Sequence, residues 1–143
     1  MGAIKTVFHM HTNHSPDCNK SVEELIALSQ ARGIGCITIT DHDTISGARE
    51  MMAKAPPGLK VIVGEEVSTT AGHIIGLYLH EPIEPERSPR ETALAILQAR
   101  SRDAHGIEVT ISRTVTVPEL MGRRGLVTAR EHARIRNALT RAG

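Results

Sequence analysis

Segments with the pattern of a strand alternate with segments that begin like a helix, from residue 4 to about residue 100 of this chain. We interpret four segments rich in Val, Ile, Leu and Thr as strands: residues 4–12, 35–41, 59–64 and 73–79. Three other segments have helical features: residues 21–33, 44–54 and 88–100. Strand, helix and strand at this spacing predict α/β units with parallel strands. Their core must be aliphatic, because Phe8 and Tyr78 are the only aromatic residues among 143.

Two of the expected helices begin with a capping box. Glu24 follows Ser21 by three residues, and Glu91 follows Ser88 at the same distance. In this motif the serine hydroxyl accepts a hydrogen bond from the backbone of the glutamate, and the glutamate side chain accepts one from the backbone of the serine. Gly33 predicts the end of the first helix, because glycine is favoured just beyond a helix C-terminus.

The first expected strand carries two histidines on one face. His9 and His11 are two residues apart, so their side chains project from the same side of an extended strand. Such a pair can bind one divalent ion, with nitrogen–metal distances of roughly 2.0–2.1 Å for zinc. Asp17 follows after a short loop and can fold back as an oxygen ligand.

The next two expected strands also end in metal-binding side chains. His42 follows the second strand, and the pair Glu65 and Glu66 ends the third. A buried parallel strand is ordinarily a run of apolar residues, and the C-terminal ends of barrel strands carry catalytic groups. One polar residue at a strand end usually has no further role, but three neighbouring ends with such residues predict a metal centre. Mixed nitrogen and carboxylate ligands suit zinc, manganese or iron.

Four segments resemble, in order and spacing, the first motifs of the polymerase and histidinol phosphatase (PHP) domain superfamily: HMHTNHSPD, ITDHDTISGA, VIVGEEVST and GHIIGLYL. The resemblance covers about residues 4–99. It implies an α/β fold, a distorted seven-stranded (β/α) barrel of which this stretch holds the first four strands. It also implies a centre of two or three metal ions and the hydrolysis of phosphoesters, including histidinol phosphate, nucleotide phosphates and nucleic-acid ends.

The resemblance assigns the motif residues to metal binding. Six residues match ligand positions or lie beside them: His9, His11, Asp17, His42, Glu66 and His73. Glu66 rather than Glu65 matches the bridging glutamate, because the family pattern is Gly-X-Glu. His73 stands in the segment GHIIG, where related proteins often have glutamate.

The resemblance also implies metal-assisted hydrolysis by Mn, Zn or Fe ions, in which two ions lower the pKa of a shared water. We expect Asp17, Asp41 and Asp43 to take part in catalysis. Asp41 or Asp43 is expected to orient His42 through its second ring nitrogen, and the sequence leaves both open. No serine nucleophile is required, so Ser15 is interpreted as a loop residue.

The sequence changes in character near residue 100. Residues 100–143 contain nine Arg, no Lys and four acidic residues, whereas residues 1–99 contain eight basic and twelve acidic residues. The resemblance implies later ligands from a strand ending in His-Pro, a pair that this sequence lacks. We therefore divide the chain into residues 1–99, the N-terminal half of a PHP domain, and residues 100–143, an atypical segment. That segment is either the product of a shifted reading frame or a remodelled terminus.

The sequence is compatible with three functions. The first is metal-dependent hydrolysis of phosphoesters, with a small nucleotide or an oligonucleotide as substrate by analogy, although the missing later ligands leave turnover by this chain open. The second is a catalytically incomplete domain that binds metal without turnover. The third is a nucleic-acid-binding module that contacts phosphates through its Arg-rich tail. A remodelled terminus would also suit a homodimer that covers an open sheet edge.

Cysteine content and hydropathy bear on where the chain acts. Cys18 and Cys36 are too few for a disulfide framework, and reduced thiols are typical of a cytoplasmic protein. No segment approaches the roughly 18 consecutive apolar residues of a membrane-spanning helix. We therefore expect no membrane partner.

Overall fold

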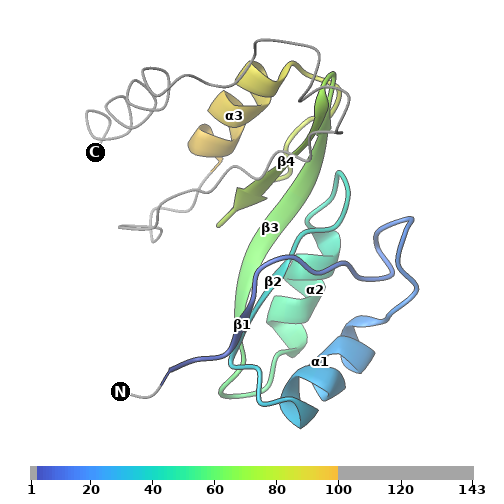
Figure 1. Cartoon of the computed structure of the whole chain (residues 1–143), viewed down its shortest axis with the longest axis vertical. Helices are drawn as coiled ribbons and strands as arrows, with labels where there is room; N and C mark the ends of the chain where they lie inside the picture. The colour runs from blue at the N-terminus through green and yellow to red at the C-terminus, as the bar shows by residue number, and fades with distance from the viewer. Residues whose placement is uncertain (1–2, 100–143) are drawn as a thin grey trace, which may run out of the picture.

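The computed structural model describes residues 3–99, and these residues form one four-stranded sheet in the order β1-β2-β3-β4 (Figure 1). The strands are β1 (Thr6–Val7), β2 (Cys36–Ile39), β3 (Lys60–Thr69) and β4 (Gly72–Leu77). The helices are α1 (Val22–Ala31), α2 (Ser46–Lys54) and α3 (Pro89–Gln98). The α/β class and the four strands of a partial barrel are as expected from the sequence. The expectations for residues 100–143 lie outside the described part of the chain.

The first strand is shorter than the sequence predicts. Only Thr6 and Val7 pair with β2, in parallel with Cys36 and Ile37. The chain nevertheless stays beside β2, because the Thr40 backbone N–H donates to the Met10 carbonyl over 2.8 Å. The expected strand at residues 4–12 is therefore a two-residue strand followed by an extended segment.

The pairing of β3 and β4 corrects the expectation that all strands are parallel. β2 and β3 are parallel, but β3 and β4 are antiparallel, with Gly64 opposite Leu77 and Thr69 opposite Gly72. Two residues separate β3 from β4, and a connection that short can join antiparallel strands only. Gly72 closes the turn with φ +103°, a conformation that costs glycine little.

The helix ends follow the sequence closely. Both capping boxes are present: Ser21 pairs with Glu24 at the start of α1, and Ser88 pairs with Glu91 at the start of α3. Gly33 follows the end of α1 with φ +63°, and its N–H donates to the Gln30 carbonyl over 3.1 Å. These contacts confirm the predicted ends of α1 and the predicted start of α3.

Removal of the first cap should have a modest, measurable cost. Ser21→Ala is expected to lower the free energy of unfolding by about 1 kcal/mol, because the Glu24 backbone N–H loses its acceptor, whereas Ser21→Gly should cost only a few tenths. Urea unfolding followed by circular dichroism measures both variants. Equal losses in the two variants would contradict a role for the cap.

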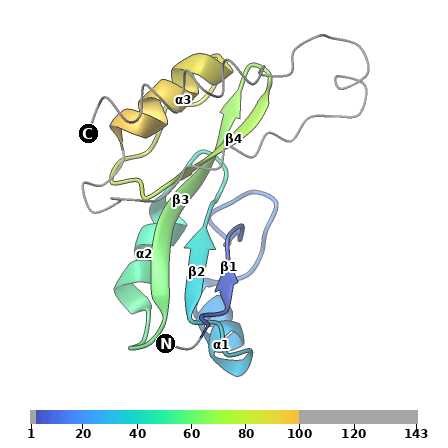
Figure 2. The ribbon, with the colours of Figure 1, turned by 60° about the vertical axis from the view of Figure 1, so that its left-hand side comes forward.

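Aliphatic side chains of the sheet and the helices form one core. Ile37 and Ile39 of β2, Met51 of α2 and Ile96 of α3 are fully buried or nearly so. α2 packs against β3, and α3 packs against β4 (Figure 2). Within the described residues, no helix combines the length and apolar character needed to cross a membrane. The sheet face away from this core carries the polar residues considered next.

Candidate metal centre

His9 and His11 lie on the extended segment that follows β1. Their ring nitrogens Nε2 are 3.0 Å apart, and the ring centroids are 5.0 Å apart. Phe8 is 63% exposed, so the side chain before His9 does not pack in the core. Extended backbone turns alternate side chains to opposite sides, and this brings the two imidazoles together as the sequence indicates.

Glu66 meets both histidines from the middle of β3. Its Oε2 lies 2.9 Å from His9 Nε2 and 3.0 Å from His11 Nε2. The sequence predicts Glu66 at the end of its strand, but β3 continues to Thr69. The segment that follows β2 is what reaches Glu66: the Glu66 N–H donates to the Asp41 carbonyl over 3.1 Å, and the Glu66 carbonyl accepts from the Asp43 N–H over 3.2 Å.

The donor set of His9, His11 and Glu66 fits a divalent ion. One ligand atom from each residue faces the other two, within 4.8 Å. A single proton can join only two of the three atoms, whereas a cation can contact all three. Ligand atoms at roughly 2.0–2.1 Å from a tetrahedral zinc are about 3.3 Å from one another, close to the separations found here. Imidazole nitrogen with carboxylate oxygen also suits manganese or iron.

A second group of potential ligands shares His11 with the first. Asp17 Oδ2 lies 2.8 Å from His11 Nδ1 and 3.5 Å from His42 Nε2. His11 therefore faces Glu66 with one ring nitrogen and Asp17 with the other. Ligand atoms of His11, Asp17 and His42 also lie within 4.8 Å of one another. Two groups that could hold a metal ion thus share one imidazole.

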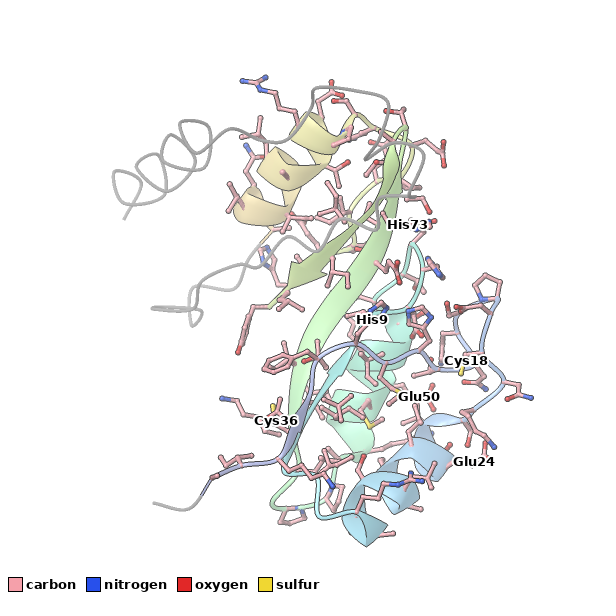
Figure 3. The ribbon with its side chains drawn as sticks, in the orientation of Figure 1. His9, Cys18, Glu24, Cys36, Glu50 and His73 are labelled. Carbon is pink, nitrogen blue, oxygen red and sulfur yellow. The ribbon has the colours of Figure 1, made fainter. Side chains whose placement is uncertain are left out.

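His42 and His73 also approach the Glu66 carboxylate, His42 at the oxygen that faces His9 and His11 and His73 at the other oxygen. His73 Nδ1 is 3.6 Å from Glu66 Oε1, and His42 Nε2 is 3.8 Å from Glu66 Oε2. The two rings are themselves neighbours, with centroids 4.9 Å apart. Figure 3 shows His9 on the segment that follows β1 and His73 near the start of β4. Four of the other five residues expected as ligands thus lie next to Glu66, and Asp17 is linked to them through His11 and His42.

Asp41 and Asp43 have partners other than the His42 ring. The Asp41 carboxylate accepts hydrogen bonds from the Thr12 N–H over 2.6 Å and from the Thr12 hydroxyl over 2.8 Å. The Asp43 carboxylate accepts from the N–H and the hydroxyl of Ser68, both over 2.7 Å. Within residues 3–99, neither carboxylate is hydrogen-bonded to His42. Both aspartates therefore connect segments of backbone that carry the histidines and Glu66.

Glu65 points away from the histidines. It is fully buried, its Oε2 accepts a hydrogen bond from the Ile83 N–H over 2.8 Å, and its Oε1 has no partner among the described residues. Burial raises the pKa of Glu65 from 4.5 to about 7, and the negative charge of Asp43 adds to the shift, although the Ile83 hydrogen bond opposes it. Of the two neighbouring glutamates, Glu66 alone faces the histidines.

The raised pKa of Glu65 predicts a pH-dependent difference in stability. Folded protein keeps the proton up to about pH 7, whereas the unfolded chain loses it near its ordinary pKa of about 4.3. Between these two pKa values, a rise in pH should therefore lower the free energy of unfolding of wild type relative to that of Glu65→Gln. Above the higher pKa, the difference between the two proteins should stay constant. Urea unfolding of both proteins from pH 4 to 8, with EDTA to remove metal, measures this. Parallel profiles would contradict the raised pKa.

Comparison with known families identifies the chain. The sequence model of the PHP domain matches residues 8–124. The chain belongs to the PHP domain family. This match includes every residue gathered around Glu66, and it extends into residues 100–143, which the sequence analysis sets apart. PHP domains are metal-dependent phosphoesterases and related hydrolases, so divalent metals belong to the family's chemistry, and the donor set of this PHP domain agrees with that.

Two curated relatives resemble part of this PHP domain. An uncharacterized protein of Methanocaldococcus jannaschii is 35% identical over 100 residues, which span 62% of this chain and 58% of that protein. A 5'-3' exoribonuclease of Haemophilus influenzae is 32% identical over 106 residues, which span 71% of this chain and 36% of that enzyme. The matches thus span about half or less of the length of these relatives.

One solved structure is also similar. It is an amidohydrolase from Chromobacterium violaceum with bound sulfate and no metal, 29% identical, with a TM-score of 0.49. The similar region covers 66% of this chain and 32% of that protein.

Ser15 lies beside the candidate metal ligands of this PHP domain and was not expected there from the sequence. The Ser15 hydroxyl donates to Asp17 Oδ1 over 2.7 Å and accepts from the His42 N–H over 3.1 Å. It lies in the loop after His11, as interpreted, but is only 3% exposed. The pKa of Asp17 is lowered to about 2, mainly by the hydrogen bond from Ser15, and the contact with His11 lowers it further. A serine within a loop has no periodicity that could have indicated this contact.

Proposed function

We propose that this chain hydrolyses phosphoesters with a divalent metal ion held by His9, His11 and Glu66. The observation that carries the proposal is the meeting of His9 Nε2, His11 Nε2 and Glu66 Oε2 at separations of 2.9–3.0 Å, although Glu66 is 55 residues from His11 in the sequence. Membership of the PHP family supports the same reaction class. A divalent ion bound there would supply a Lewis acid and would favour hydroxide at neutral pH.

The chain's own residues would orient the ligands. Asp17 would accept a hydrogen bond from His11 Nδ1, which is 2.8 Å away. With the proton on Nδ1, the other ring nitrogen, Nε2, would be free as a ligand on the side that faces Glu66. A carboxylate behind a metal-binding histidine fixes the tautomer and raises the basicity of the ligand. Asp17 would thus act through His11, and it would also lie within reach of an ion at His42, whose Nε2 is 3.5 Å away.

A second ion would be held by His42 and His73, which lie 3.8 and 3.6 Å from the Glu66 carboxylate, together with Asp17, 3.5 Å from His42. Two ions would supply positive charge that stabilises both the attacking and the leaving oxygen in phosphoryl transfer. Asp41 and Asp43 would serve this centre by holding the backbone around His42 and Glu66, without contact to the substrate.

The proposed substrate class is a nucleotide or a short oligonucleotide. The support is the curated relative named a 5'-3' exoribonuclease, which is 32% identical over the matched residues. Manganese, zinc and iron are the proposed metals, because the ligand set combines imidazole with carboxylate. A cytoplasmic location and a homodimer remain proposals on the sequence grounds given above.

A second candidate is metal binding without turnover. The chain spans 58% and 36% of its two curated relatives, and the His-Pro pair that the family uses for later ligands is absent from its sequence. In this case His9, His11 and Glu66 would still bind an ion. The proposed nucleic-acid contact of the Arg-rich tail concerns residues outside the described part.

A metal-dependent assay separates these candidates. The purified full chain is stripped with EDTA, reloaded with Mn, Zn or Fe, and assayed for phosphate release from mononucleotides and for shortening of a short RNA. Turnover that requires added metal supports the hydrolase. Metal bound without turnover favours the second candidate, and a wild-type chain that binds no metal overturns both.

A further inference from the structure

The loop that follows His11 is fastened to the end of β2. Thr12 is fully buried, and it donates both its N–H and its hydroxyl to Asp41, over 2.6 and 2.8 Å. Thr12 is the residue after His11, and Asp41 is the residue before His42. One carboxylate therefore ties together the two backbone segments that carry these histidines.

The surroundings of Asp41 are built to hold its carboxylate in one place. Asp41 is fully buried, and a buried carboxylate is costly unless its oxygens are hydrogen-bonded. Gly47, in the first turn of α2, lies directly against this pair, and a Cβ there would collide with Asp41 Oδ2 and Thr12 Oγ1. A helix N-terminus favours a neighbouring negative charge. The space that Gly47 leaves open is thus filled by the Thr12–Asp41 contact.

A second contact fastens the same loop three residues later. The Ser15 hydroxyl accepts from the His42 N–H over 3.1 Å, and it donates to Asp17 over 2.7 Å. Thr12 and Ser15 therefore attach the loop to two consecutive residues, Asp41 and His42. The distance between His11 and His42, whose ring centroids are 4.8 Å apart, is fixed by these hydroxyls.

We infer that Thr12, Asp41 and Gly47 form a positioning device that holds His11 and His42 at the separation needed to bind metal. Asp41 acts through the backbone of the Thr12 loop and not through the His42 ring. This inference rests on the proposed function, because it requires His11 and His42 to bind an ion. It assigns a role to Thr12 and Gly47, which make no hydrogen bond to the candidate ligand atoms among the described residues.

Two variants disturb the device in different ways. Thr12→Val keeps the backbone hydrogen bond to Asp41 and removes only the hydroxyl, whereas Thr12→Ser keeps the hydroxyl. Gly47→Ala should favour α2 by roughly 0.5–1 kcal/mol on helix propensity alone, yet its methyl group displaces the Asp41 carboxylate. Displaced positioning partners of metal ligands typically weaken metal binding by about 10–100-fold, so propensity and positioning predict different outcomes for Gly47→Ala.

The test measures metal affinity on folded, metal-free protein. Equilibrium dialysis with Mn²⁺ and the visible spectrum of bound Co²⁺ are recorded for wild type, His9→Ala, Thr12→Val, Thr12→Ser and Gly47→Ala, after circular dichroism has verified folding. We expect about 10–100-fold weaker binding and an altered Co²⁺ spectrum in Thr12→Val and Gly47→Ala. Thr12→Ser should keep the metal affinity and the Co²⁺ spectrum of wild type.

The outcomes separate this inference from the proposed function. Wild-type affinity and an unchanged spectrum in Thr12→Val overturn the positioning role alone. If Thr12→Val does not fold, Gly47→Ala decides in the same way. A wild-type chain that binds no metal, or a His9→Ala variant that binds as wild type does, instead overturns the proposed function on which the inference rests.

Discussion

Glu66→Gln is expected to reduce metal-dependent hydrolysis by on the order of 10²–10³-fold, the typical cost of removing one group that stabilises the transition state. Glutamine has the shape of glutamate but no negative charge, and Glu66 is the residue that contacts both His9 and His11, at 2.9 and 3.0 Å. Loss of the charge removes the attraction for a cation at the point where the ligands meet. Phosphate release at saturating Mn²⁺, with bound metal measured in parallel, gives the result.

The chain offers a matched control one residue earlier. Glu65→Gln makes the same chemical change in the same strand, but Glu65 is buried on the opposite side and binds the Ile83 N–H. This variant should retain metal and turnover. If the two variants lost metal binding and turnover to the same extent, the loss would indicate a general effect on β3 and would contradict the assignment of Glu66.

The largest effect on stability is expected for Ile39→Ala. Ile39 lies in β2 with no exposed surface, between β1 and β3 in the sheet. Truncation of a buried isoleucine loses transfer free energy and leaves a cavity, and the typical cost is 2–5 kcal/mol. We expect a loss of about 3 kcal/mol in the free energy of unfolding, measured in urea at constant pH and with EDTA present.

The control for Ile39→Ala is an aliphatic residue on the surface. Leu94→Ala truncates a side chain of α3 that is 46% exposed, so its cost should remain within about 0.5 kcal/mol, apart from helix propensity. If the free energy of unfolding fell by similar amounts in the two variants, this would contradict the burial of Ile39 in the core.

Local sequence patterns predicted the helices well because their ends depend on neighbouring residues. Ser21 with Glu24 and Ser88 with Glu91 form the expected capping boxes. Gly33 takes the expected positive φ after α1. Each of these contacts lies within a few residues along the chain, so no tertiary information was needed.

The strands were predicted less well because their ends depend on partners. β3 was expected to end near Gly64, but β4 pairs with it from Gly64 to Thr69. His42, after the end of β2, also pairs with it at Glu66. The polar residues Glu65 and Glu66 concealed this extension, because they interrupt the apolar run. Once β3 reaches Thr69, only a two-residue turn separates it from β4, and the antiparallel pairing follows.

The sequence could indicate which residues come together at the candidate site, but not the contacts between them. The spacing of His9 and His11 and their resemblance to the PHP motifs indicated the residues that meet around Glu66. The sequence could not indicate that His11 faces Glu66 and Asp17 with different nitrogens, or that Asp41 binds Thr12. Hydroxyl residues of loops, such as Thr12 and Ser15, carry no periodic signal, and only the folded chain brings them to their partners.

Diffraction from crystals grown with Mn²⁺, recorded near the manganese absorption edge, tests the central claim most directly. The account predicts an anomalous peak bounded by His9 Nε2, His11 Nε2 and Glu66 Oε2, which disappears in crystals of Glu66→Gln. A wild-type crystal soaked in excess Mn²⁺ with no peak among these three atoms would contradict it.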